Sequence, residues 1–276
     1  MWFLNAFTDP YLSGVIARGA VVGVLVSVCA ALLGVTLVLK RFSMIGDGLS
    51  HVGFGAMALA AALGLGREFS LEFSVPVVML ASFLLLQLTA KGRLKGDAAI
   101  AVISSSAVAF GVVLYDLAGG MTADACSSLF GSSSIMTVSK KDLLVSVALC
   151  LTVLVLFTLL YHRVFAMTFD DTFVRATGSK GQGYSLLLSL LTSVTVVVGM
   201  KMMGAIMIAA LIIFPALTAM RLCKSFRGVV VTAAALSVGC FVIGFLVGCW
   251  FGLQTGPCVV LVNLAVLLPV SLIKRA

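Results

Sequence analysis

The sequence predicts an all-α, polytopic integral membrane protein, a helical bundle with about eight or nine transmembrane helices. Of its 276 residues, 62% are hydrophobic and only 10% are charged, and the mean hydropathy is +1.23. Soluble domains are typically about 45–50% apolar and about 25% charged, so an ordinary water-soluble protein is excluded, and a disordered chain is excluded as well. Because one helical crossing of a bilayer takes about 20 apolar residues, the apolar content suffices for about eight or nine crossings.

Nine apolar runs are long enough to span a membrane, and they leave little chain for a soluble domain. We therefore expect residues 1–276 to form a single transmembrane domain. Membrane β-strands would alternate apolar and polar residues, which these runs do not, so they are predicted as helices. Only Lys201 separates the sixth run from the seventh, so eight crossings with one re-entrant or half-length helix remain an alternative. The runs are 14–39, 44–64, 75–90, 98–118, 143–160, 184–200, 202–220, 229–250 and 257–273.

Basic residues predict the orientation of these spans. One set of loops, which includes the C-terminus, carries 13 of the 18 Lys and Arg residues, and the opposite set carries 4. Cytoplasmic loops are enriched in Lys and Arg, so the first set is expected in the cytoplasm, beside anionic lipid head groups. The charges are spread over several loops, with no basic helix or aromatic platform, so nucleic-acid binding is not expected.

Two ionisable residues near the start of the second span form the most informative local pattern. Asp47 and His51 are four residues apart, so on a helix their side chains share one face. A carboxylate and an imidazole are suitable ligands for a divalent first-row metal such as Mn²⁺, Fe²⁺ or Zn²⁺. Ionisable groups inside a membrane tend to mark transport paths, and a site with only two protein ligands would release an ion readily. The alternative is a hydrogen-bonded pair that only caps the helix at its cytoplasmic end.

A second feature is the long loop 161–182, expected on the cytoplasmic side. Thr168 or Asp170 is a candidate N-cap for a short helix that runs through Arg175. Phe169 and Phe173 would share one face of that helix and form an apolar knob. Such a helix would lie flat on the membrane or dock into a groove of a partner protein, and composition does not choose between these outcomes.

Four stretches, taken together, resemble one family along nearly the whole chain. The first contains Ile45-Gly46-Asp47-Gly48-Leu49-Ser50-His51, and the last is Thr255-Gly256-Pro257 at the opening of the final span. The chain is similar to the membrane permease subunits of bacterial ATP-binding-cassette importers for zinc, manganese or iron, the ABC-3 metal permeases. The four stretches are residues 39–51, 169–178, 201–216 and 255–257.

The resemblance implies a type II ABC importer-like permease in the bacterial plasma (inner) membrane. It implies a second permease copy or a paralogue, cytoplasmic ABC ATPase subunits, and an extracytoplasmic metal-binding protein as donor. Asp47 and His51 would be the metal ligands of the path. Phe169, Asp170, Phe173 and Arg175 would belong to the coupling helix, within 168–178, that enters the ATPase groove. The divalent metal would be the substrate, with no permanently bound cofactor and no enzymatic reaction on this chain.

The source of energy is not on this chain, because no GxxxxGK[ST] phosphate-binding loop occurs in it. ATP is therefore expected on a partner subunit. The chain departs from zinc-type members near the fourth span, where Ser104, Ser105 and Ser106 replace an intramembrane His, which favours a harder cation than zinc. The alternatives are a self-sufficient secondary metal transporter and an intramembrane metal-dependent enzyme, although no clear internal repeat and no HExxH motif support them.

Overall fold

The computed structural model describes residues 10–40, 42, 44–65, 70–90, 96–117, 140–169 and 181–273, and these form ten α-helices. Nine of the helices have 18 to 30 residues, and each coincides with one predicted span. The tenth, α8, is a short helix of nine residues. The helices are α2 (Pro10–Leu39), α3 (Ile45–Ala62), α4 (Ser70–Ala90), α5 (Gly96–Leu117), α7 (Lys140–Leu159), α8 (Tyr161–Phe169), α10 (Gly181–Met203), α11 (Ala205–Leu222), α12 (Phe226–Phe251) and α13 (Thr255–Ile273).

The helices confirm the predicted all-α membrane fold. Seven of them contain segments that are long and apolar enough to cross a membrane. Their mean hydropathies range from 1.9 to 2.7, and α4 adds a shorter apolar stretch, Glu72–Leu85. The seven segments are Ile16–Leu39, Ala98–Leu117, Lys141–Leu159, Gly183–Met203, Ala205–Leu222, Phe226–Phe251 and Thr255–Leu272.

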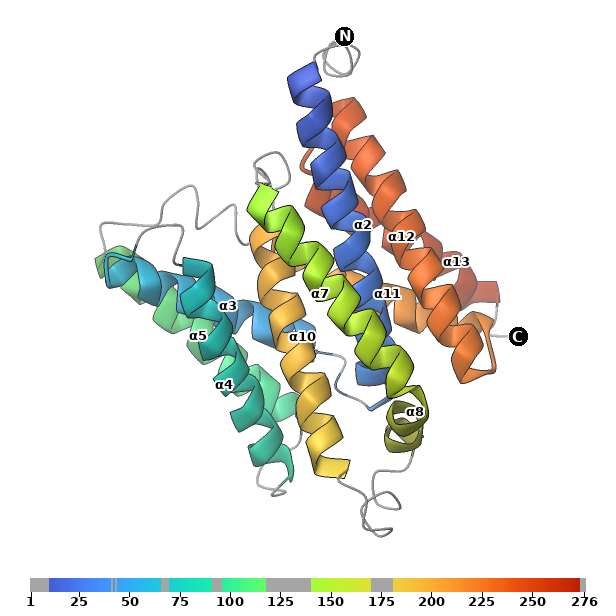
Figure 1. Ribbon diagram of the computed structural model, residues 1–276, viewed down its shortest axis with the longest axis horizontal. Helices are drawn as coiled ribbons and strands as arrows, with labels where there is room; N and C mark the ends of the chain where they lie inside the picture. Colours follow the sequence, from blue (N-terminus) through green and yellow to red (C-terminus); the bar gives the residue numbers. More distant parts are fainter. Residues whose placement is uncertain are drawn as a thin grey trace.

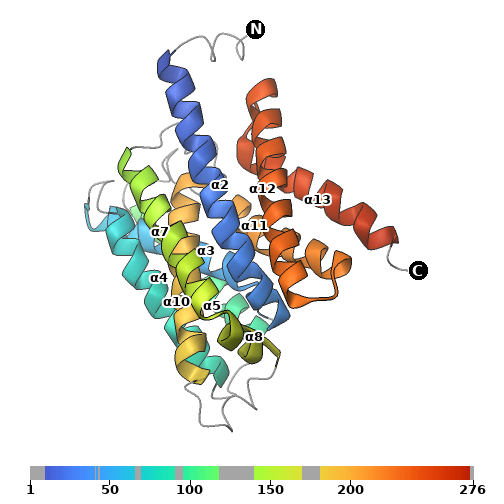
Figure 2. The same cartoon turned by 45° about the vertical axis from the view of Figure 1, so that its right-hand side comes forward.

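Two groups of helices lie on either side of α2 and α10 (Figures 1 and 2). One group consists of α3, α4 and α5, with α4 packed against α10. The other consists of α11, α12 and α13, with α11 and α12 both packed against α2. The main buried core joins the groups, since it includes Val22 of α2, Leu49 of α3, Met200 of α10 and Ile208 of α11.

The break between α10 and α11 lies at Gly204, three residues after the predicted boundary at Lys201. Gly204 has a φ of 92°, a conformation that glycine adopts without the steric cost that a Cβ brings. Lys201 lies in the last turn of α10. Both helices have the length and hydropathy expected of a span. The chain therefore forms two full-length helices here, and the alternative of a half-length helix does not apply to this pair.

The loop predicted at 161–182 begins with a helix, which corrects that part of the prediction. In α8, Val164, Met167 and Thr168 are buried at helical spacing. Thr168 lies within α8, where its hydroxyl donates a hydrogen bond to the Val164 carbonyl at 2.6 Å. The other candidate cap, Asp170, and the predicted coupling segment beyond it lie outside the described residues.

Helix ends that the charge pattern assigns to the cytoplasm are joined to one another. Lys40, after α2, donates a hydrogen bond to Ser185 of α10 at 3.1 Å. Arg221, at the end of α11, donates one to the Ser271 hydroxyl near the end of α13 at 2.8 Å. Each of these two pairs therefore joins helix ends that the charge pattern assigns to the same side of the membrane.

Candidate functional site

Glycines allow α3 to pack closely against its neighbours. A Cβ added at Gly48 would lie 2.6 Å from Ile100 Cγ2, and one added at Gly55 would lie 2.8 Å from the Ala107 carbonyl oxygen. Both distances are shorter than the closest approach of two non-bonded atoms, so a residue larger than glycine does not fit at these positions unless α3 or α5 moves. Small residues permit such close approach of helices in membranes, where interhelical packing supplies much of the stability.

The start of α3 lies well inside the bundle, not at its cytoplasmic end. After α2 the chain turns back, with Phe42 N–H bonded to the Leu37 carbonyl and Ile45 N–H bonded to the Phe42 carbonyl. A Cβ at Gly46 would lie 2.7 Å from Ile212 Cδ1. Ile212 is about 10 Å along α11 from its first residue and about 15 Å from its last, at 1.5 Å per residue. The first turn of α3, which contains Asp47, therefore lies beside the middle of α11.

Asp47 and His51 face each other along α3, as their spacing predicts. The distance from His51 Nε2 to Asp47 Oδ2 is 3.6 Å, and the two side chains are 30% and 44% exposed, respectively. The other imidazole nitrogen, Nδ1, is buried and has no hydrogen-bond partner among the described residues. The pair is thus accessible on one side, and its imidazole has an unsatisfied nitrogen on the other.

The alternative of a simple helix cap receives no support from this geometry. A separation of 3.6 Å is too long for a hydrogen bond between the two side chains. The N-cap residue is Met44, which makes no side-chain capping bond. Asp47 lies in the first turn, where a carboxylate interacts favourably with the helix dipole. Neither side chain therefore serves as the N-cap of α3.

The distance between the two atoms is compatible with a divalent cation bound to both. Metal–nitrogen and metal–oxygen bonds of about 2.1 Å are typical for Zn²⁺ and similar ions. An ion at that distance from both atoms fits between them, since the sum of the two bonds exceeds the observed separation. Within the described ranges no group of three or more His, Cys, Asp or Glu side chains could hold a metal. The described part of the chain therefore offers two ligands and leaves other coordination positions open.

Of the four residues predicted to couple to an ATPase, the structure describes only Phe169. Its side chain is 63% exposed at the end of α8. Its ring lies 4.9 Å from that of Phe165 and 6.2 Å from that of Phe226. Asp170, Phe173 and Arg175 lie outside the described residues.

One polar contact between spans was missed in the sequence. Lys201 Nζ of α10 lies 3.8 Å from Asp142 Oδ1 of α7. Beside it, the Ser146 hydroxyl donates to Met202 Sδ at 3.1 Å. The predicted helix ends place both charges on the outer side, but the two residues are 59 positions apart, so no local signal indicates the pairing. The contact ties the start of α7 to the end of α10.

A family model described as the ABC 3 transport family matches residues 13–274. Among curated relatives, the manganese import system permease protein ScaB of Streptococcus gordonii is 28% identical over 248 residues, covering 90% of this chain and 87% of that protein. The manganese transport system membrane protein MntC of Halalkalibacterium halodurans is 27% identical over 260 residues, covering 94% and 87%.

The fold has a counterpart among solved structures. A chain of PsaBC from Streptococcus pneumoniae, solved in complex with Fab, superposes with a TM-score of 0.81. The match covers 97% of this chain and 94% of that chain, with 24% sequence identity. At this identity the likeness supports the arrangement of the helices alone.

Proposed function

Because the chain belongs to the ABC 3 transport family, we propose that it is the permease subunit of an ATP-driven importer for a divalent transition metal. It is a multi-pass protein of the bacterial membrane. The ion, Mn²⁺, Zn²⁺ or Fe²⁺, would pass from an extracytoplasmic binding protein through a path that contains Asp47 and His51. A separate cytoplasmic ATPase would supply the energy.

The main support for the proposed metal path is the position of the Asp47–His51 pair. A charged side chain inside a membrane protein is costly unless it faces a partner or a water-filled path. Here the carboxylate is 44% exposed and has an imidazole nitrogen 3.6 Å away, and the preceding residue, Gly46, lies beside the middle of α11. A cation between the two groups would neutralise the carboxylate and take up imidazole coordination, which accounts for two ionisable groups at this depth.

Mn²⁺ is the first candidate for the transported ion. Two of the similar permeases are named for manganese. One carboxylate and one imidazole, without a thiolate, also suit a relatively hard cation. The remaining coordination positions would be taken by water or by the same pair on a second permease copy. Few fixed protein ligands favour release, which transport requires.

The proposed ATPase partner would supply the nucleotide-binding site that this chain lacks. It has no phosphate-binding loop, so ATP would bind a cytoplasmic ABC ATPase subunit, and the segment after α8 would be its docking helix. We propose that Phe169, Asp170, Phe173 and Arg175 form that contact. ATP binding would move this segment, rock the packed helices and alternate the access to Asp47 and His51 between the two sides.

The test is uptake of radioactive Mn²⁺ by proteoliposomes that contain the permease, with and without a cognate ABC ATPase, and with a cognate metal-binding protein outside. We expect uptake to require the ATPase and ATP. Asp47→Asn and His51→Ala are expected to reduce uptake by about 10- to 100-fold or more, since even residues that only support metal ligands have effects of that size.

The matched control is Asp116→Asn, which removes an exposed carboxylate at the end of α5 and should leave uptake unchanged. Wild-type uptake in both Asp47→Asn and His51→Ala would reject the proposed path. Uptake by the permease alone would identify a secondary transporter instead. Turnover of a substrate by the permease in detergent would identify an enzyme.

A further inference from the structure

An aromatic cluster joins α8 to the start of α12. Tyr161, Phe165 and Phe169 are spaced four residues apart and share one face of α8. Their ring centroids lie 5.5, 5.3 and 6.2 Å, respectively, from that of Phe226, the first residue of α12. Phe226 is only 8% exposed. We refer to Tyr161, Phe165, Phe169 and Phe226 as the aromatic clamp, since one buried ring contacts three rings along the whole of α8.

Charged side chains hold α8 on two sides. The Arg227 guanidinium lies 5.5 Å from the Tyr161 ring centroid, which adds a cation–π contact to the clamp. Arg163 donates a hydrogen bond to the Tyr184 hydroxyl of α10, and its guanidinium lies 5.2 Å from that ring. The clamp therefore connects α8 to α12 through several rings, and Arg163 with Tyr184 forms a polar pair between α8 and α10.

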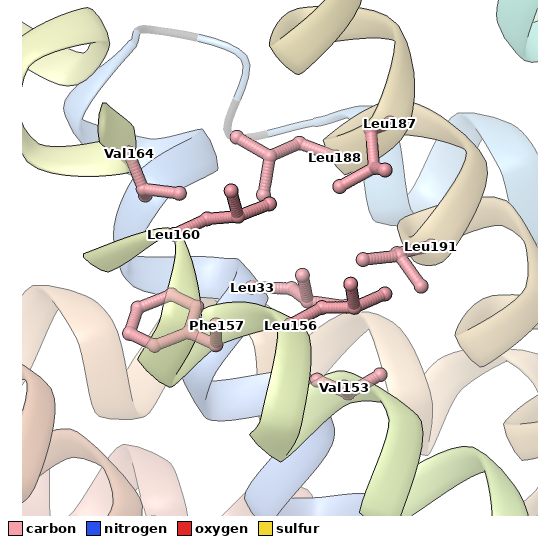
Figure 3. Close-up of a pocket in the computed structure, with 9 residues that line it drawn as sticks. All are labelled: Leu33, Val153, Leu156, Phe157, Leu160, Val164, Leu187, Leu188 and Leu191. Carbon is pink, nitrogen blue, oxygen red and sulfur yellow. The ribbon is translucent and has the colours of Figure 1, made fainter. Parts of the chain in front are cut away.

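An apolar cavity separates the junction of α7 and α8 from α10 (Figure 3). Leu160 and Val164 line it from the junction, and Leu187, Leu188 and Leu191 line it from α10. Around this cavity Val164 of α8 and Leu188 of α10 belong to the same buried cluster, so aliphatic side chains also join these two helices. The contact of α8 with α12 is therefore aromatic, whereas its contact with α10 consists of aliphatic side chains and one polar pair.

The clamp leads by direct contacts to the first turn of α3. Residues 223–225 connect α11 to Phe226, and the turn is fixed because Ser225 Oγ accepts a hydrogen bond from Gly228 N–H at 3.2 Å. Midway along α11, Ile212 lies against Gly46, next to Asp47. A rigid displacement of α8 with the start of α12 would therefore reach α11, which lies against Gly46, the residue before Asp47.

We propose that Phe226 is a positioning residue that makes α8 and the start of α12 move as one unit, so that displacement of the segment following α8 is transmitted to α11 and the Asp47–His51 site. This inference rests on the proposed function, because it assumes that a cytoplasmic ATPase moves that segment. It assigns a mechanical role to a residue that lies outside the proposed metal site and that contacts one of the proposed docking residues, Phe169.

The first test measures the number of Mn²⁺ ions moved per ATP hydrolysed by the reconstituted permease–ATPase complex. In Phe226→Ala we expect this ratio to fall roughly 2- to 30-fold, the range found for residues on a coupling path, while ATP hydrolysis persists. Phe226→Tyr keeps the ring and should restore the ratio. Phe251→Ala, which removes the exposed phenylalanine at the other end of α12, is the matched control and should leave it unchanged.

The second test does not depend on transport. Spin labels at residues 166 and 231, both exposed, report the distance between α8 and α12, and labels at 166 and 183 report that between α8 and α10. These pairs are introduced in a chain whose cysteines are replaced. When a non-hydrolysable ATP analogue is added to the complex, we expect the 166–183 distance to change and the 166–231 distance to stay constant. In Phe226→Ala both distances should change.

The two tests separate failure of the clamp from failure of the proposed function. An unchanged ratio of Mn²⁺ to ATP in Phe226→Ala overturns the inference, as does a 166–231 distance that changes as much as the 166–183 distance in the wild type. If Phe226→Ala does not assemble with the ATPase, Phe226→Leu replaces it and the wild-type label distances decide. A wild-type complex that hydrolyses ATP without moving Mn²⁺ rejects the transport proposal, and the label distances still decide the clamp.

Discussion

Helices α3 and α7 have nearly the same length, 18 and 20 residues, yet they are stabilised by different surroundings. In α3, 12 of the 18 residues are buried, and a Cβ added at any of its four glycines would come within 2.9 Å of a neighbouring atom. In α7, which has no glycine, only 28% of the apolar span is buried, and Leu144, Leu151 and Leu159 are 64% to 74% exposed. The more apolar of the two helices is therefore the less buried.

This difference in burial shows that apolar residues serve different purposes in α3 and in α7. In a membrane the hydrophobic effect does not drive helices together, because lipid tails are as apolar as leucine. The apolar face of α7 is therefore suited to lipid, whereas the small residues of α3 allow close contact with α5, α10 and α11. Because α3 is surrounded by protein, it can hold Asp47 and His51 in the bundle. In contrast, α7 carries no acidic, basic or histidine side chain beyond its first turn.

The largest effect is expected from adding volume to each helix in turn. Gly55→Leu places a large side chain against the Ala107 carbonyl, 2.8 Å from the new Cβ, so α3 and α5 must separate. Overpacking against backbone should destabilise the protein by about 3 kcal/mol or more. Ala148→Leu makes a comparable addition on the exposed face of α7 and should be tolerated. The measurement is the yield of monodisperse protein and its melting temperature in detergent; equal losses in both variants would contradict the comparison.

The second prediction changes the chemistry of α3 and leaves its packing alone. Asp47→Cys replaces a hard ligand with a thiol that favours softer ions, so the ratio of Zn²⁺ to Mn²⁺ uptake should rise several-fold. The melting temperature should fall only slightly, since the Asp47 side chain is 44% exposed and the main loss is its interaction with the helix dipole, about 0.3–1 kcal/mol. The matched control is Leu151→Cys, which puts the same thiol on the exposed face of α7. A ratio that changes equally in both variants would show that the thiol acts away from the path.

The helix boundaries and the facing of Asp47 and His51 could be predicted from sequence because both depend on local properties. A 20-residue apolar run and a spacing of four residues define a helix and one of its faces without knowledge of the neighbours. The break at Gly204 was displaced by three residues because Lys201 was taken as the interruption, although the positive φ belongs to the glycine. The α8 helix was missed because it is short and follows a span directly.

The depth of Asp47 and the aromatic clamp could not be predicted, because they depend on contacts between distant residues. Asp47 lies inside the bundle because the chain turns back after α2 and because Ile212, 165 residues later, fills the space beside Gly46. Phe226 meets α8 only after α10 and α11 have been placed. A single sequence gives the periodicity of each helix and no information about which helices meet.

The third prediction concerns the ion pair that ties α7 to α10. Lys201 and Asp142 are 30% and 26% exposed, and their charged atoms lie 3.8 Å apart. A double-mutant cycle with Lys201→Met and Asp142→Asn should give a coupling energy of about 1 kcal/mol or less, as for other partly exposed pairs. The measurement is the free energy of unfolding in mixed micelles at low and high salt. A coupling above about 3 kcal/mol, or one that salt does not weaken, would mean that this contact holds α7 as firmly as glycine packing holds α3.

The smallest effect is expected from removing volume on the exposed face of α7. Leu151→Ala and Leu159→Ala delete side chains that are 64% and 74% exposed and therefore create no cavity. In lipid or detergent the loss of stability should be within about 0.5 kcal/mol, as for substitutions outside a packed core. Unfolding in mixed micelles measures this loss, and transport should be unchanged. A loss above about 2 kcal/mol, the cost of deleting a buried leucine, would show that this face packs against protein. Its occupant would then be a second permease copy in place of lipid, and the loss should depend on protein concentration, because subunit association contributes to stability only when the subunits meet.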